Sequence, residues 1–440
     1  MKSKSKSNPG NSLSNVQFIK QLQDINQQVS NPVEAARQKA GLVGKWMQES
    51  PLEFFGEIRD NHPIFPTPLF TIVTRYTDVM EVFHNDEIFT IDIFTPKVLR
   101  DIGPFLLSMN NSPEYERQKS ILRLAFPRED ANRFHQIVAE ELHKLLGKIA
   151  ASETFDLVSQ YARLLPALAM RCYLGLEEIP PEKVMQWTRP LFRDVFVNIN
   201  NAPQVSQEAV AAREEAAPFI DNLIARRHEH LNQHPQQPAT TVLDRLLVMQ
   251  TIPATCLSDE EVRNCLLGFF MGTIDLTSVA IINAVVELLN RPAILAEAIE
   301  AAKQQGDQAI AGYVWEALRF QPPATGLFRS CTQDYTLARG TDRETQIKAG
   351  SLIYAASAAA MHDPTHIDAP AEFRVGRPQQ SYLFFESGIH TCFGKYFSLV
   401  QIPLAIEGLL RLGQLEIAGE FQKDRGLPES LPMNIIKPAK

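Results

Sequence analysis

The chain has 440 residues, of which 45% are hydrophobic and 21% are charged, a globular composition that excludes collagen-like, disordered and disulfide-scaffold classes. Acidic residues outnumber basic residues by 51 to 43, so the chain lacks a positively charged nucleic-acid footprint and we expect no nucleic-acid partner. The longest apolar run, from Cys265 to Ile274, is far shorter than the roughly 20 residues of a membrane span, so we expect a buried helix and no transmembrane segment.

The five cysteines form no CxxC pair and are odd in number, which argues against a disulfide framework and predicts a reducing, cytoplasmic compartment. The first 45 residues are polar and lack the apolar stretch of a secretory signal. We therefore predict a flexible N-terminal extension over residues 1–45 and one large domain over residues 46–440.

After this extension, the sequence predicts a strand over 70–74 and a short helix over 76–83. Residues 88–112 are apolar but interrupted by Pro and Gly, so we expect a long functional loop there. Helical periodicity dominates from residue 114 onward. Helices are predicted over 114–126, 130–150, 155–175, 181–198, 204–233, 257–290, 308–320 and 394–412.

The longest of these helices, 257–290, begins at a capping box formed by Ser258 and Glu261. Short strand-like runs and a Pro-rich loop over 364–378 separate the last two helices. No internal repeat is visible, so the predicted fold class is mainly α with a smaller β-rich part.

A cysteine in a glycine-bracketed loop is the strongest chemical feature. Cys392 lies in the run FESGIHTCFG (385–394), directly before the predicted helix 394–412. Backbone N–H groups and a helix N-terminus stabilise a thiolate, and such a thiolate can be an axial ligand of iron. A small buried cysteine in a turn is the structural alternative.

A second feature is a charge pair on the helix 308–320. Glu316 and Arg319 are three residues apart and share one face of a largely apolar helix, which suggests a buried pair. Arg377, in the run FRVGRP (373–378), offers a third member.

The order of ExxR at 316–319, FxxxRP at 373–378 and the cysteine loop at 385–394 resembles the cytochrome P450 family over roughly residues 48–440. The resemblance implies the cytochrome P450 fold, a single haem domain and haem b (iron protoporphyrin IX) as cofactor. It implies that Cys392 is the metal ligand, bound to the haem iron within a loop that begins at Phe385. It also implies propionate contacts from His390 and Arg329, and a structural network of Glu316, Arg319 and Arg377.

Three departures from the family pattern concern the haem site. Glu386 stands where the family usually has the first glycine of the cysteine loop, so a side chain must be accommodated there. Tyr115 and Lys119 occupy the positions of a His or Trp and a basic residue four later, and both can still donate to a propionate. Leu276 replaces the threonine whose hydroxyl, in the family, helps deliver protons to dioxygen.

The residues around Leu276 are candidates for the catalytic role of that hydroxyl. Thr273 shares the helix face of Leu276, and three roles are open to it: it substitutes for the hydroxyl, contacts a different ligand, or bonds back to its own helix. Asp275 is the neighbouring acid, and Thr277 lies about 100° around the helix. For an apolar substrate the expected lining includes Phe269, Phe270, Ala280 and Phe328, although aromatic residues at this spacing also form ordinary cores.

The resemblance favours a monooxygenase that inserts one oxygen atom of dioxygen into a hydrophobic small molecule. Electrons would come from a separate ferredoxin or flavin-type donor, because no reductase domain fits in this length. We predict a basic docking surface for that donor from Arg117, Lys119, Arg123, Arg128 and Lys395, with Lys119 turned inward. The leucine keeps open a hydroperoxide isomerase or peroxygenase that needs no donor, and a non-catalytic haem-thiolate sensor is the third alternative.

Overall fold

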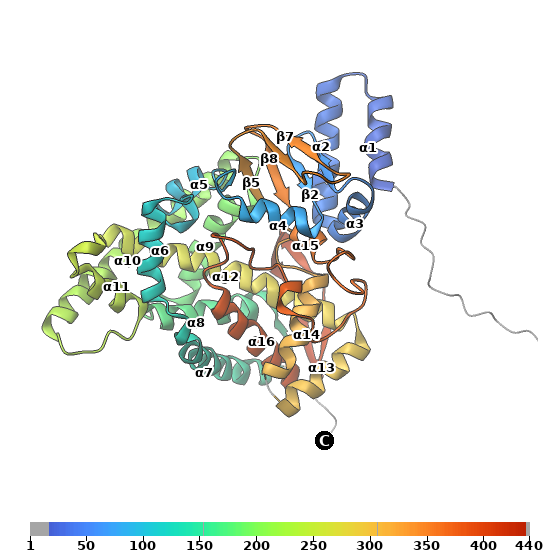
Figure 1. The fold of residues 1–440 in the computed structure, drawn as a ribbon. Helices are drawn as coiled ribbons and strands as arrows, with labels where there is room; N and C mark the ends of the chain where they lie inside the picture. The colour runs from blue at the N-terminus through green and yellow to red at the C-terminus, as the bar shows by residue number, and fades with distance from the viewer. Residues whose placement is uncertain (1–16, 153, 306, 437–440) are drawn as a thin grey trace, which may run out of the picture.

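The computed structural model describes residues 17–152, 154–305 and 307–436, and it is mainly helical with a smaller β-rich part, as predicted (Figure 1). The helices are α1 (Gln17–Gln28), α2 (Pro32–Glu49), α3 (Pro51–Asn61), α4 (Tyr76–His84), α5 (Thr95–Asp101), α6 (Pro113–Ala125), α7 (Ala131–Ala150), α8 (Leu164–Leu174), α9 (Pro181–Phe192), α10 (Pro203–Gln233), α11 (Val242–Gln250), α12 (Asp259–Leu289), α13 (Pro292–Gln305), α14 (Asp307–Phe320), α15 (Ser357–Ala360) and α16 (Lys395–Leu412).

The strands are short and lie in several small sheets. They are β1 (Ile64–Pro66), β2 (Thr71–Val73), β3 (Phe89–Thr90), β4 (Thr154–Asp156), β5 (Leu327–Cys331), β6 (Tyr335–Leu337), β7 (Thr345–Ile347), β8 (Leu352–Ala355), β9 (Gln414–Ile417), β10 (Gln422–Asp424), β11 (Leu427–Ser430) and β12 (Pro432–Ile436). The largest sheet has the order β1-β2-β8-β5-β3, in which β2 and β8 are parallel and the other pairs are antiparallel.

Helices α1 and α2 form a hairpin that projects from the body beside α3 (Figure 1). Ile19, Leu22 and Ile25 are buried along one face of α1, and the ring of Phe18 lies 5.0 Å from that of Trp46 in α2. The predicted extension over 1–45 therefore contains two packed helices in its described part, and its boundary falls inside α2. Residues 1–16 lie outside the described residues.

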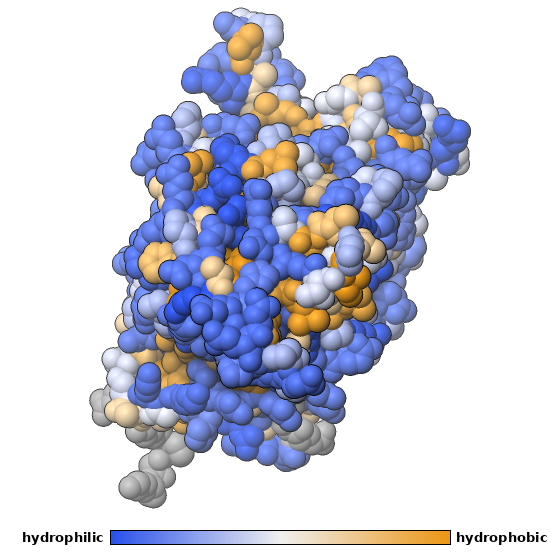
Figure 2. Space-filling model, turned by 90° about the vertical axis from the view of Figure 1, so that its left-hand side faces the viewer, coloured by the Kyte–Doolittle hydropathy of each residue, from blue (hydrophilic) through white to orange (hydrophobic). Residues whose placement is uncertain are grey.

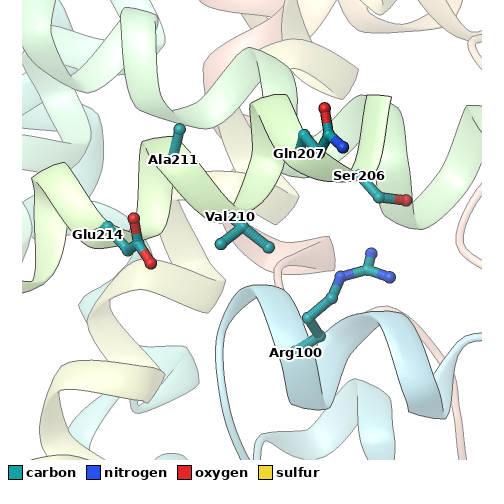
Figure 3. Close-up of a pocket in the computed structure, with 6 residues that line it drawn as sticks. All are labelled: Arg100, Ser206, Gln207, Val210, Ala211 and Glu214. Atoms are coloured by element: carbon teal, nitrogen blue, oxygen red, sulfur yellow. The ribbon is translucent and has the colours of Figure 1, made fainter. Parts of the chain in front are cut away.

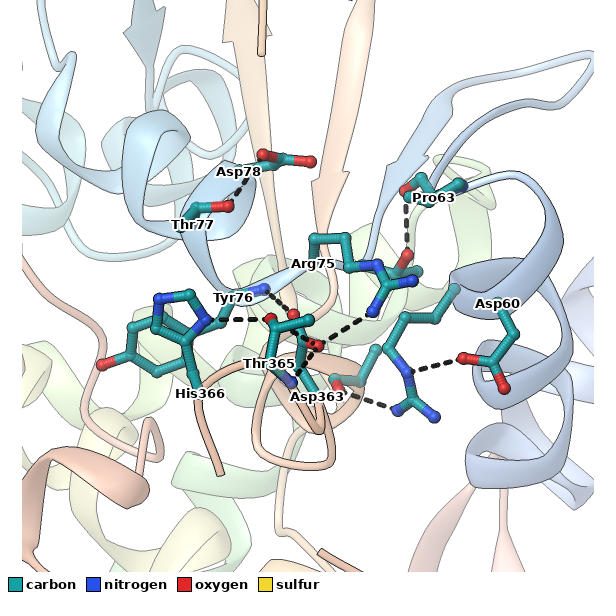
Figure 4. A network of polar contacts seen from close by, with 12 residues as sticks. Asp60, Pro63, Arg75, Tyr76, Thr77, Asp78, Asp363, Thr365 and His366 are labelled. Atoms are coloured by element: carbon teal, nitrogen blue, oxygen red, sulfur yellow. Dashed lines mark hydrogen bonds and ion pairs between the residues drawn. The ribbon is translucent and has the colours of Figure 1, made fainter. Parts of the chain in front are cut away.

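A buried carboxylate joins the loop after α15 to the start of α4 (Figure 4). Asp363 accepts hydrogen bonds from Arg75 Nη1 at 3.0 Å, from the Tyr76 backbone N–H at 2.9 Å and from the Thr365 hydroxyl at 2.8 Å. Burial raises the pKa of Asp363, but these donors outweigh it and hold the pKa below its usual value. The β-rich part is thereby tied to the loop that leads toward the cysteine motif.

The long helix α12 runs through the interior of the protein. It begins at the predicted capping box, in which the Ser258 hydroxyl accepts from the Glu261 N–H at 3.2 Å. By length and composition α12 could cross a membrane, but 78% of its most apolar window is buried inside the protein, as in a core helix. The outer surface on the α10 and α11 side is mostly hydrophilic, with scattered hydrophobic patches (Figure 2).

Helices predicted near 114–126, 204–233, 308–320 and 394–412 are confirmed as α6, α10, α14 and α16. The helix predicted over 155–175 is wrong at its start, because β4 pairs there with the distant strand β12 and the α-helix begins only at Leu164. The loop predicted over 88–112 contains β3 and α5. Pro96 is one of the prolines that predict this loop, but it lies in the first turn of α5, a position where proline favours the start of a helix.

Candidate active site

Cys392 lies in a tight loop directly before α16. Its backbone N–H donates to the Phe385 carbonyl oxygen at 2.9 Å, which closes the loop. A side chain at Gly388, whose φ is +79°, would place its Cβ 2.4 Å from the Phe83 carbonyl oxygen, so only glycine fits against α4. Phe385 itself is half-buried, with the Lys395 ammonium 6.0 Å from its ring centroid.

The Cys392 side chain is solvent-accessible, yet enough protein surrounds the sulfur that burial raises its pKa to about 11. Hydrogen bonds from the backbone N–H groups of Gly394 and Lys395 act in the opposite direction, as the sequence predicted for this loop. At neutral pH the free thiol therefore keeps its proton. A coordinated metal cation would remove the proton, because a coordinating thiol is deprotonated outright.

Two side chains of α6 meet the same loop. The Tyr115 hydroxyl donates to the Ile389 carbonyl oxygen at 2.6 Å, and Lys119 Nζ donates to that oxygen at 2.7 Å and to the Tyr115 hydroxyl at 2.9 Å. Lys119 is thus turned inward, as predicted. Burial raises the pKa of Tyr115 to about 12 and lowers that of Lys119.

His390 brings an unsatisfied ring nitrogen into this cluster. Its Nε2 is buried and has no hydrogen-bond partner among the described residues. Burial, followed by the nearby Arg329 guanidinium, lowers the pKa of His390 to about 4, so the ring is neutral at pH 7. A buried polar atom without a partner is costly, which makes this nitrogen suited to a ligand that can hydrogen-bond with it.

Arg329, on β5, is paired with Glu386 from the cysteine loop. Its Nη2 lies 2.9 Å from Glu386 Oε1, and the two side chains are only 3% and 12% exposed. Glu386 has φ +56°, a left-handed conformation that costs a non-glycine residue roughly 1–2 kcal/mol. Burial raises the pKa of Glu386, and Arg329 opposes that rise.

Glu316, Arg319 and Arg377 are brought together behind this loop. Arg319 donates from Nε and Nη2 to the two Glu316 oxygens at 2.8 and 3.0 Å, and both side chains are fully buried. Arg377 Nε lies 3.2 Å from Glu316 Oε1. The Arg374 backbone N–H donates to Glu316 Oε2 at 2.9 Å. Burial raises the pKa of Glu316, but these partners hold it below its usual value.

One face of α12 is open in an otherwise buried helix. Gly272 is exposed, and a Cβ at this position would meet nothing within 4 Å. Thr273, Leu276 and Val279 are half-buried on the same face, whereas Thr277 is buried beside it. Thr273 and Leu276 therefore border the same open space. Leu276 stands where the family has a threonine, and Thr273 is the residue that could supply the hydroxyl instead.

Asp275 points away from that face into a buried charge cluster. Its Oδ1 lies 2.7 Å from Arg189 Nε on α9 and 3.2 Å from Nε of Arg163, which directly precedes α8. Arg189 also donates to the Pro428 carbonyl oxygen at 3.0 Å, so it joins α9, α12 and β11. The sequence interpretation missed both arginines. A carboxylate inside an apolar helix signals that cations must be near, but not which ones.

The four residues predicted to bind substrate are apolar and buried in different surroundings. Phe269 packs against Phe105 and Phe126, and its ring lies 5.6 Å from that of Phe393, next to Cys392. Phe270 and Ala280 lie in the core of α12. Phe328, on β5, lies with its ring 5.1 Å from Phe70 and 4.8 Å from Tyr354.

A separate pocket lies between α5 and α10 (Figure 3). Its lining residues are Arg100, Ser206, Gln207, Val210, Ala211 and Glu214. Arg100 is held by ion pairs with Asp101, at 2.6 Å, and with Asp194. The pocket shares no lining residue with the cysteine loop, so we assign it to the contact between these helices.

Comparison with known proteins agrees with this geometry. The family model described as cytochrome P450 matches residues 68–438. The chain belongs to the cytochrome P450 family.

Relatives of this cytochrome P450 include the mycinamicin IV hydroxylase/epoxidase of Micromonospora griseorubida, 25% identical, with 81% of this chain and 86% of the relative covered. The pulcherriminic acid synthase of Bacillus subtilis (strain 168) is 22% identical, with 90% and 96% covered. Among solved structures, CalO2 superposes with a TM-score of 0.75 at 21% identity, with 89% of this chain and 97% of CalO2 covered. The fold is that of a cytochrome P450, and the chain is an oxidoreductase of the monooxygenase family.

Membership implies a haem iron cofactor, and the residues present fit one. Cys392 supplies a thiol faced by backbone N–H groups, and His390 supplies a buried nitrogen without a partner among the described residues. Beside Gly272 there is open space on α12, while Phe269 of the same helix contacts Phe393 of the cysteine loop. This donor set matches a thiolate-ligated haem with acidic substituents at its edge.

Proposed function

We propose that this cytochrome P450 inserts one oxygen atom of dioxygen into a hydrophobic small molecule, in the cytoplasm, with electrons from a ferredoxin or flavin-type donor. The single observation that carries the proposal is the position of Cys392, in a loop closed by its N–H bond to the Phe385 carbonyl oxygen at 2.9 Å, directly before α16. When bound, haem b supplies the redox chemistry and the activation of oxygen.

In this proposal the cysteine loop and α6 bind the cofactor. Cys392 holds the iron, while Tyr115, Lys119, His390 and Arg329 take the propionates. Tyr115 and Lys119 already share the Ile389 carbonyl oxygen, so both are preorganised and lose little side-chain entropy on binding. Glu316, Arg319 and Arg377 keep the chain behind this loop in place.

The distal side is proposed to be dry and apolar. Leu276 borders the open face of α12 without a hydroxyl, and Thr273, one turn earlier, is the hydroxyl nearest to it on that face. Asp275 is engaged by Arg163 and Arg189, so it can move a proton only if these ion pairs loosen. Phe269 and the aromatic rings around Phe328 suit an apolar substrate.

The electron donor is proposed to dock where α6 ends and α16 begins. Arg123 and Arg128 are exposed there, Leu124 is 67% exposed, and the Arg128 guanidinium stacks 4.4 Å from the Tyr396 ring centroid. Lys395, half-buried at the start of α16, is the third basic residue of this proposed docking surface. The predicted member Arg117 does not belong to it, because Arg117 is engaged by Glu114 and Glu261.

A second function is favoured by one observation. Leu276 donates no hydrogen bond and Asp275 is held by two arginines, so proton delivery for dioxygen activation has no free acidic group at this turn of α12. A hydroperoxide isomerase or peroxygenase needs neither those protons nor an electron donor. Dioxygen use remains our first proposal, since the relatives include a hydroxylase/epoxidase.

The experiment is Leu276→Thr, with Val279→Thr as the matched control one turn later on the same face. Both proteins are assayed with a panel of fatty acids and terpenoids plus NADH and added redox proteins, and separately with a fatty-acid hydroperoxide alone. A monooxygenase gains product formed per NADH consumed, by up to about 10²-fold if one preorganised donor is restored. Less hydrogen peroxide is released.

A hydroperoxide-using enzyme gives the opposite result. Leu276→Thr then leaves reductant-driven turnover negligible and lowers hydroperoxide turnover, because a polar group enters a dry pocket. Equal effects of Leu276→Thr and Val279→Thr in both assays would show that position 276 does not face the reacting centre. Ligand-induced spectral shifts without turnover under either condition would leave only a sensor.

A further inference from the structure

Glu386 is a carboxylate at a strained position of the cysteine loop, where the family usually has glycine. Its φ of +56° is unfavourable for any residue with a side chain. Its carboxylate is largely buried and lies 2.9 Å from Arg329 Nη2. A strained backbone and a buried charge persist together only if the surrounding structure holds them, and here the partner is Arg329.

Arg329 is thereby oriented before any ligand arrives. Its Nη1 donates to the Phe328 carbonyl oxygen at 2.9 Å and its Nη2 donates to Glu386, which fixes the plane of the guanidinium. Arg329 is the one guanidinium among the side chains assigned to the propionates, and its ion pair with Glu386 sets a carboxylate beside it at 2.9 Å. A propionate at Arg329 would therefore share this cation with Glu386.

We infer that Glu386 is a positioning residue that orients Arg329 and lowers the reduction potential of the haem held by Cys392. The inference rests on the proposed haem site. Reduction adds one electron to the ferric iron, with no bond formed or broken, so the oxidised state carries one more positive charge. The negative charge of Glu386 offsets the positive charge of Arg329, so less positive charge faces the oxidised state and that state is stabilised.

The test is a spectroelectrochemical titration of the haem-loaded protein, in which the electrode supplies the electron through mediators. Glu386→Gln removes the charge and Glu386→Asp keeps it. Glu287→Gln is the matched control, because Glu287 is also a largely buried carboxylate, 2.6 Å from Arg291, but lies at the far end of α12. As a general scale, Coulomb's law at an effective dielectric constant of about 20 gives about a tenfold change in an equilibrium when a unit charge at about 12 Å is removed.

Glu386→Gln should therefore raise the equilibrium constant for reduction about tenfold, which is about 59 mV for one electron. Glu386→Asp and Glu287→Gln should stay near the wild-type potential. A Glu386→Gln potential at or below the wild-type value would overturn the inference, and so would an equal rise in Glu386→Asp, because shape and not charge would then be responsible.

A second variant keeps the test valid if Glu386→Gln folds poorly. Glu386→Gly also removes the charge, and it places the family's usual residue at this left-handed position, so the backbone strain is relieved. Loss of haem binding in both Glu386→Gln and Glu386→Gly would overturn the inference and make Glu386 a purely structural residue. Failure of the proposed function looks different, since the wild-type protein itself would then lack the reduced carbon monoxide spectrum of a thiolate-ligated haem.

Discussion

Replacing Glu316 with alanine tests the buried charge network behind the cysteine loop. The carboxylate accepts from Arg319 at 2.8 and 3.0 Å, from the Arg374 N–H at 2.9 Å and from the Tyr382 hydroxyl at 3.2 Å. Without it, Arg319 keeps its hydrogen bonds to the carbonyl oxygens of Pro370 and Glu372 but loses its counter-charge, while remaining fully buried.

Removing one member of such a pair costs roughly 3–5 kcal/mol, against a typical total stability of roughly 5–15 kcal/mol. We therefore expect the urea midpoint of Glu316→Ala, followed by circular dichroism, to fall by about a fifth or more. The exposed pair of Glu34 and Arg37 on α2 gives the control, because Glu34→Ala should leave the midpoint unchanged. A Glu316→Ala protein that unfolds at the wild-type urea concentration would refute the reasoning.

The same carboxyl group gives a pH dependence with a definite sign. The folded-state pKa of Glu316 lies below its usual value of 4.5, so its contribution to stability is present above 4.5 and is lost as the pH falls through the folded-state pKa. Glu316→Gln should remove this part of the acid destabilisation, which is measured as the difference between the urea midpoints at pH 7 and pH 4.

Three further variants test the remaining assignments. Cys392→Ser should abolish the red-shifted Soret band of the reduced carbon monoxide complex, and survival of that band would show that another group is the axial ligand. Charge reversal at Arg123 and Lys395 should slow reduction by the electron donor at low salt. The control Lys45→Glu on α2 should leave that rate unchanged. Reduction rates that do not depend on ionic strength in any of these proteins would refute the docking proposal. Asp275→Asn leaves two buried arginines without their carboxylate and should cost roughly 3 kcal/mol in unfolding free energy, so an unchanged urea midpoint would contradict the charge cluster.

Local signals in the sequence were sufficient for most helices. The capping box at Ser258 and Glu261 marks the start of α12, and α14 ends at Phe320, two residues before a proline pair. Strand β4 was not predictable in the same way, since it exists only because residues 154–156 pair with β12, almost 280 residues later. The α1 hairpin did leave a signal, because Ile19, Leu22 and Ile25 recur every three residues within a polar segment.

In the candidate site, too, local features were predictable from the sequence and long-range contacts were not. Residue spacing placed Glu316 and Arg319 on one helix face, and the glycines around Cys392 predicted a tight loop directly before a helix. The partners of Asp275 and Glu386 were not predictable, because Arg163, Arg189 and Arg329 approach them from other elements, 57 to 112 residues away in the chain. Long-range ion pairs follow from tertiary structure and leave no periodic pattern.

The two departures from the family pattern act on different steps, and this determines how their effects combine. Leu276 lies on the open face of α12, whereas Glu386 lies in the cysteine loop and is paired with β5, so the two side chains share no hydrogen-bond or ion-pair partner among the described contacts. Substitutions at independent sites usually add in free energy, so their fold-changes multiply.

In a dioxygen-using enzyme Glu386→Gln should change the rate of electron uptake, and Leu276→Thr should change the fraction of electrons that end in product. The double variant should therefore show both single effects undiminished when the two quantities are measured separately. A double variant in which one effect abolishes the other would mean that the carboxylate and the distal pocket control the same step, contrary to the positions of these residues.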